Sequence, residues 1–165
     1  MENRNEKKEI LNGIFNQIAS FDNKANILIQ VMGIVFAISI SFLTVASDEV
    51  FKLKGDVIKI CYNVLFILFT INMIIAVLLF ILVIFPRKHR DNITYANYYY
   101  DIYSLSKEEF NSAFNEYIKD DNRLSEQIII NASVCRYKHR YLTLGIIALI
   151  PASILLLTLI FILVL

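Results

Sequence analysis

The feature that most constrains this chain is a set of three long apolar runs that contain no Asp, Glu, Lys, Arg or His. The runs cover residues 27–46, 60–85 and 141–165, which makes them 20, 26 and 25 residues long. A helix of about 20 mostly apolar residues can cross the roughly 30 Å hydrocarbon core of a bilayer. Each run therefore predicts a transmembrane helix, and the chain is expected to be an integral membrane protein.

The residues outside these runs are too few to form a large soluble domain. The chain has 165 residues, 57% of them hydrophobic, and a mean hydropathy of +0.57. A short polar remainder cannot build a sizeable core of its own, which argues against a separate catalytic domain.

The side chains that usually carry catalysis or bind metals are also not arranged for it. The four glycines are isolated, so they form no phosphate-binding loop. The two histidines stand alone among basic residues, and no nucleophile motif is present. The apolar runs also lack the acids of proton-coupled transporters. We therefore expect no catalytic residue, no metal, no cofactor and no enzymatic activity.

The distribution of Lys and Arg predicts the orientation in the membrane. Residues 1–26 and 86–140 carry thirteen of them, whereas residues 47–59 carry three. With three spans, the two richer segments lie on the same side of the bilayer. Because positively charged segments remain in the cytoplasm, we expect a cytoplasmic N-terminus and an external C-terminus.

The polar segments predict helices that extend the membrane spans. Residues 5–26 place apolar side chains at helical spacing, and no Pro separates them from the first run. A continuous helix is expected there, although an interfacial helix lying flat on the lipid has the same pattern. Ser106 and Glu109 match a capping box, which predicts a helix start. A further helix after residues 119–122 leads into the third run.

The predicted fold is therefore all-α, with three transmembrane helices and a small cytoplasmic helical bundle formed by their extensions. The expected segments are a cytoplasmic amphipathic helix (1–26), transmembrane helix 1 (27–46), an external loop (47–59), transmembrane helix 2 (60–85), a cytoplasmic helical segment (86–140) and transmembrane helix 3 (141–165).

Small residues recur at four-residue intervals within the first run, at Gly33, Ala37 and Ser41. Such a stripe lets a second helix approach closely, and we predict that it is a helix-packing surface. The partner helix can be another span of the same chain or a span of a second copy. The pattern alone leaves both alternatives open.

Residues 86–140 combine nine Lys and Arg residues with many tyrosines. Basic residues beside a span attract anionic lipid, and tyrosines favour the headgroup level, so the composition fits a membrane-surface belt. It also fits a nucleotide site, in which cations pair with phosphate and aromatic faces stack on the base. The tyrosines in question are Tyr95, Tyr98, Tyr99, Tyr100 and Tyr103.

Three regions of the chain resemble the Pycsar-type transmembrane effectors, small bacterial membrane proteins encoded beside nucleotide cyclases in antiphage operons. The first is an Asp-x-Lys-Ala box at residues 22–25, within the sequence FDNKANIL. The second is YSLSKEEF at residues 103–110, and the third is Gln127 followed by RYK at residues 136–138. Their order relative to the three spans also matches that family.

The resemblance implies a function as a membrane effector of cyclic-nucleotide antiphage signalling. Such an effector binds a cyclic nucleotide on its cytoplasmic side and impairs the bacterial inner membrane, which causes abortive infection. The implied partners are the cyclic nucleotide, a nucleotide cyclase, the lipid bilayer and further copies of the chain in a homo-oligomer, with no nucleic acid. The residues expected to bind the nucleotide or to couple its binding to the spans are Asp22, Lys24, Gln127, Arg136 and Lys138.

The charges of the first box need partners at the membrane boundary, because an unpaired charge is costly there. We expect Asp22 and Lys24 to bond to Gln127 or Arg136, and Arg136 and Lys138 to be the better candidates for phosphate. Two other functions fit the same sequence: a holin-like pore that needs no ligand, and a membrane scaffold that binds a protein partner through residues 106–135.

Overall fold

The computed structural model consists of α-helices. It describes residues 2–54, 56–85, 105–119 and 121–164. The helices are α1 (Glu2–Lys54), α2 (Asp56–Ile84), α4 (Lys107–Lys119) and α5 (Asp121–Val164). These described residues contain no strand, so the all-α prediction is confirmed. The expected cytoplasmic bundle stays a prediction, and the five tyrosines of residues 95–103 lie outside the described residues.

Three of the helices are long and apolar enough to cross a membrane. The matching stretches are Arg4–Val45 of α1, Asp56–Ile84 of α2 and Leu124–Val164 of α5. They contain the three apolar runs of the sequence, with only Ala46, Phe85 and Leu165 left outside. The prediction of three transmembrane helices is confirmed, and the chain is a multi-pass membrane protein.

The helices are longer than the apolar runs predicted. α1 continues from Glu2 through the first run to Lys54, and α2 already begins at Asp56. Residues 47–54 and 56–59 are therefore helical, where the sequence predicted an external loop. The polar and charged residues of this segment indicate contact with water, but they are compatible with a helix, and the segment contains no Pro to end one.

The chain divides into two compact units. One comprises Met1–Ala19 and Pro86–Arg136 and is called the polar unit below. The other comprises Ser20–Phe85 and Tyr137–Leu165 and is called the membrane unit. α1 and α5 each contribute residues to both units.

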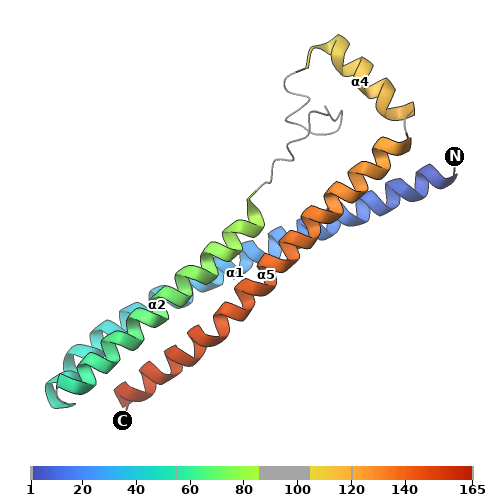
Figure 1. The fold of residues 1–165 in the computed structure, drawn as a ribbon. Coiled ribbons are helices and arrows are strands. Elements are labelled where there is room, and N and C mark those ends of the chain that lie inside the picture. Colours follow the sequence, from blue (N-terminus) through green and yellow to red (C-terminus); the bar gives the residue numbers. More distant parts are fainter. Residues whose placement is uncertain (1, 55, 86–104, 120, 165) are drawn as a thin grey trace. The chain divides into compact units, whose positions relative to one another are not determined.

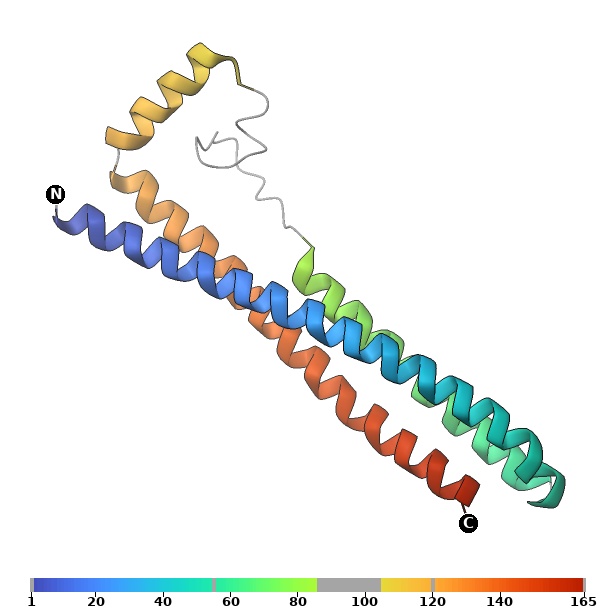
Figure 2. The ribbon, with the colours of Figure 1, turned by 180° about the vertical axis from the view of Figure 1, so that it is seen from behind.

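In the membrane unit, α1, α2 and α5 run side by side (Figure 1), and the reverse view in Figure 2 shows the same arrangement. A narrow core between them consists of one stripe of side chains from each helix. Its fully buried members include Leu43 of α1, Phe69 and Phe80 of α2, and Leu159 of α5. The outward faces are also apolar, as expected for helices surrounded by lipid rather than water.

Two local features hold these helices at defined positions. Near one end of the unit, the buried Tyr62 hydroxyl of α2 donates a hydrogen bond of 3.0 Å to the carbonyl of Leu43 in α1. Farther along α2, the ring of Phe80 lies against Gly145 of α5. A Cβ atom added to Gly145 would lie 2.5 Å from Cε1 of Phe80. Gly145 therefore allows a close contact that no larger residue permits.

The small-residue stripe predicted from the sequence does not take part in these contacts between helices. Gly33, Ala37 and Ser41 are exposed, and a Cβ added to Gly33 meets no atom within 4 Å. The stripe is not buried against another helix within the described membrane unit. Packing against a second copy of the chain stays a prediction.

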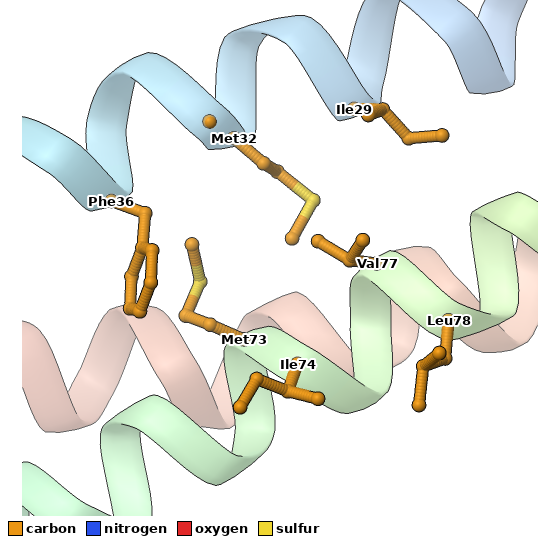
Figure 3. Close-up of a pocket in the computed structure, with 8 residues that line it drawn as sticks. Ile29, Met32, Phe36, Met73, Ile74, Val77 and Leu78 are labelled. Atoms are coloured by element: carbon orange, nitrogen blue, oxygen red, sulfur yellow. The ribbon is translucent and has the colours of Figure 1, made fainter.

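A hollow of about 320 Å³ lies between α1 and α2 beside Gly33. Figure 3 shows Met32 and Phe36 of α1 facing Met73 and Val77 of α2 across it. Every residue that lines this hollow is apolar or glycine. It is therefore suited to hydrocarbon rather than to a charged ligand.

The predicted capping box is present at the start of α4, in the polar unit. The Ser106 backbone amide donates to Oε2 of Glu109 at 2.8 Å, and the Glu109 amide donates to the Ser106 hydroxyl at 3.3 Å. These bonds to Ser106 lower the pKa of Glu109, because they stabilise its ionised form. The box satisfies donors that the first helical turn leaves without partners.

We predict that replacing Gly145 with Ala destabilises the membrane unit by about 1–3 kcal/mol, because the new methyl group overlaps the buried Phe80 ring. Thermal unfolding of the protein in detergent, followed by circular dichroism, measures the effect. Gly33→Ala is the matched control and should leave the midpoint unchanged. Phe80→Leu should recover part of the loss in the Gly145→Ala background. Equal midpoints for the two glycine variants would contradict this packing.

We also predict that the start of α4 frays in acid. Because the folded-state pKa of Glu109 is lowered, the cap contributes stability above the ordinary pKa of a Glu and loses it as the pH falls through the lowered value. Backbone chemical shifts of residues 107–110 should therefore lose helical character below about pH 4. Glu109→Gln should remove this pH dependence, whereas Glu108→Gln should keep it. Identical titrations of the two variants would disprove the assignment.

Candidate functional site: a buried lysine where three helices meet

The most unusual polar group of the membrane unit is the ammonium group of Lys138. The residue lies in α5 three positions before the third apolar run, and only 8% of its surface is exposed. Its Nζ forms an ion pair with Oδ1 of Asp22 in α1 and donates a hydrogen bond of 2.5 Å to the carbonyl of Val83 in α2. One side chain thus connects all three membrane helices.

The bond to Val83 has a clear role in α2. The last four carbonyls of a helix have no amide partner within that helix, and this end carries partial negative charge. α2 ends at Ile84, Val83 is fully buried, and the last turn of α2 contains no basic residue. Lys138 supplies from a neighbouring helix the cation that α2 lacks.

Asp22 balances the charge of Lys138. Its side chain is 37% exposed, against 9% for that of Lys138, so the carboxylate lies at the more open side of the pair. A buried ammonium without a counterion would be strongly destabilised. The two residues therefore depend on each other. Lys138 depends more strongly on the ion pair than Asp22 does, because Lys138 is the more deeply buried.

An aromatic contact lies beside this pair. The rings of Phe21 in α1 and His139 in α5 have centroids 5.5 Å apart. The ammonium group of Lys24 lies over the same Phe21 ring, 5.9 Å from its centroid. We call Phe21, Asp22, Lys24, Lys138 and His139, together with the Val83 carbonyl, the boundary cluster.

The structure brings together some of the residues predicted from the sequence. Asp22, Lys24 and Lys138 belong to the boundary cluster, but the observed partner of Asp22 is Lys138 instead of Gln127 or Arg136. Lys24 lies over an aromatic ring. Whether any of the five residues binds a nucleotide stays a prediction.

Gln127 and Arg136 belong to the polar unit. Gln127 is buried, and its carbonyl accepts a hydrogen bond of 2.8 Å from the Asn131 side chain. Arg136 is exposed. In the same unit, the Cys135 thiol lies 3.5 Å from Oε1 of Gln17, which brings α1 and α5 together there.

Sequence reasoning missed Phe21, His139 and the Val83 carbonyl as parts of the site. One weak signal for Val83 was available, because the last turn of α2 contains no basic residue, although Arg87 and Lys88 follow closely in the sequence. The ring contact of Phe21 and His139 had no comparable signal. It depends on the register between α1 and α5, which local patterns do not contain.

We predict that Lys138→Met destabilises the protein by about 2–4 kcal/mol, since it leaves both the Asp22 carboxylate and the Val83 carbonyl without their partner. Asp22→Asn should cost less, about 1 kcal/mol, because Asp22 is partly exposed. Unfolding of the detergent-solubilised protein measures both.

The exposed Lys59 of α2 provides the control, and Lys59→Met should have no effect. The double variant of Asp22 and Lys138 should lose less stability than the sum of the single variants, because they share one interaction. Full additivity would show that the ion pair contributes nothing.

Comparison with known proteins identifies the family to which the chain belongs. The model of the Pycsar effector protein domain, PycTM, matches residues 7–165. No curated protein and no solved structure matches the chain. The family match includes the boundary cluster and all three membrane helices, and it confirms the resemblance seen in the sequence. The chain therefore belongs to the Pycsar effector (PycTM) family.

Proposed function

We propose that this protein binds a cyclic nucleotide on its cytoplasmic side and, in response, impairs the bacterial inner membrane. The observation that carries the proposal is the family match over residues 7–165. Membership of this family makes the chain a membrane effector in antiphage defence, and its domain is a transmembrane effector domain rather than one of a known catalytic family. The outcome proposed for the infected cell is abortive infection.

The proposed partner enzyme follows from the same family, and the proposed orientation in the membrane follows from the charge distribution. A nucleotide cyclase is the partner that would supply the ligand after infection. The excess of Lys and Arg in residues 1–26 and 86–140 supports a cytoplasmic location for these segments and an external C-terminus. The nucleotide would then be available to the polar unit from the cytoplasm.

The residues of α5 differ in how they can serve this function. Arg136 is exposed, so its guanidinium group is accessible to a phosphate, for which it is a strong hydrogen-bond donor. The Lys138 ammonium already has two partners in the membrane unit. We therefore assign ligand contact to Arg136, and we assign coupling to Asp22, Lys138 and the buried Gln127.

The proposed coupling uses the continuity of α5. The helix contains Arg136 in the polar unit and Lys138 in the membrane unit, two residues apart. A ligand shifts a protein toward the conformation that it binds better. A nucleotide that moves this turn of α5 would change the contacts of Lys138 with α1 and α2, and so the packing of the three membrane helices.

A holin-like pore that needs no ligand is the second candidate function. The exposed stripe of Gly33, Ala37 and Ser41 favours it, because such a stripe is suited to assembly with other copies. Expression without a cyclase separates the two functions. A ligand-gated effector should be tolerated, and toxicity in cells without any cyclic-nucleotide signal would favour the pore.

We predict that the purified protein binds at least one cyclic mono- or oligonucleotide and that Arg136→Gln weakens this binding about tenfold or more, as expected for the loss of a charge-assisted hydrogen bond. Isothermal titration in detergent measures the affinity. Arg140→Gln removes another exposed cation, four residues later, and should leave the affinity nearly unchanged.

Lys138→Met provides the test of coupling. It should leave nucleotide affinity within about threefold of the unchanged protein but abolish the membrane damage that a co-expressed cyclase causes, measured by entry of a membrane-impermeant dye. Failure to bind any cyclic nucleotide would overturn the proposed function. Dye entry that is unaffected by Lys138→Met would overturn the coupling role alone.

A further inference from the structure

We propose that the exposed side of the boundary cluster, formed by Lys24, Phe21 and His139, binds the phosphate of an anionic phospholipid headgroup. This site is separate from the nucleotide site proposed above. Lys24 then contacts lipid, whereas the sequence suggested that it binds the nucleotide or couples its binding to the spans. The inference does not depend on a nucleotide, a cyclase or the orientation of the protein, because both leaflets of a bilayer present headgroups.

The geometry places two polar groups around one aromatic ring. Lys24 lies over Phe21 with its ammonium group 5.9 Å from the ring centroid, and the His139 ring lies 5.5 Å from Phe21 on the neighbouring helix. Lys24 and His139 are both exposed, whereas Phe21 is half-buried. Two hydrogen-bond donors, the Lys24 ammonium group and the His139 imidazole, thus lie beside the Phe21 ring at an accessible surface formed by α1 and α5.

Positive charge exceeds negative charge in the two helix segments that form this surface. In the adjoining turns, residues 20–28 of α1 and 137–144 of α5, Asp22 is the only carboxylate. That carboxylate is paired with Lys138, so it is not available to Lys24. Within these turns, Lys24 and the exposed Arg140 therefore carry positive charge that no carboxylate balances, which favours the binding of an external anion.

The depth of the cluster favours lipid as the source of that anion. Lys24 precedes the first apolar run by three residues, and His139 precedes the third by two. The nearby tyrosines Tyr137 and Tyr141 are typical of the headgroup level. Phospholipid phosphates are concentrated at this level, and an anionic headgroup attracts nearby Lys and Arg residues. Free inorganic phosphate has the same chemistry and must be distinguished by experiment.

The test uses the full-length protein in nanodiscs of phosphatidylcholine that contain increasing fractions of phosphatidylglycerol. Native mass spectrometry of the released protein gives the ratio of bound phosphatidylglycerol to phosphatidylcholine. We expect a preference for phosphatidylglycerol that Lys24→Gln reduces about fivefold, which corresponds to roughly 1 kcal/mol for one cation at an anionic surface. His139→Ala should reduce it by a smaller factor.

Lys59→Gln is the matched control, because it removes an exposed cation from the other end of the membrane unit. Circular dichroism shows whether each variant keeps its helix content, and Lys24→Arg should retain the preference. No preference in the unchanged protein, or equal losses for Lys24→Gln and Lys59→Gln, would overturn the site. Binding of inorganic phosphate in pure phosphatidylcholine nanodiscs that is lost with Lys24→Gln would assign the site to free phosphate and overturn the lipid assignment.

Discussion

The arrangement of the membrane unit depends on the charge of one lysine. An ammonium group that is buried between helices cannot remain unpaired, and Lys138 is buried in this way. The Asp22 carboxylate balances its charge, and the Val83 carbonyl uses the same ammonium group to complete the end of α2. This single requirement fixes one position each on α1, α2 and α5 relative to the others.

Apolar contacts alone would leave these positions poorly defined. Lipid tails are as apolar as the side chains of the spans, so the helices gain specificity from close packing and hydrogen bonds rather than from burial. Contacts of this kind occur along the membrane unit. The bonds of Lys138 in the boundary cluster lie at one end, and the hydrogen bond from the Tyr62 hydroxyl to the Leu43 carbonyl lies toward the other. The close packing of Phe80 against Gly145 lies between them. Most remaining apolar surface faces outward to lipid.

Sequence reasoning succeeded where the determining signal is local. Hydrophobicity identified the three spans, and the spacing of Ser106 and Glu109 identified the start of α4, because both depend on neighbouring residues. It failed where the signal is the register between helices. The pairing of Asp22 with Lys138 and the importance of Gly145 both depend on which faces meet. Residues 47–54 and 56–59 of the expected external loop are helical, and the external position of this segment stays a prediction.

The most direct test of the central claim, that Lys138 holds the three helices together, is a distance measurement by pulsed electron paramagnetic resonance. Spin labels at Ile84→Cys of α2 and Thr143→Cys of α5 are attached at exposed positions of the membrane unit, with Cys61 and Cys135 replaced by Ser. With Lys138 intact, we expect one narrow distance distribution in nanodiscs. With Lys138→Met, we expect a broader distribution that extends to longer distances. An unchanged distribution would contradict the central claim.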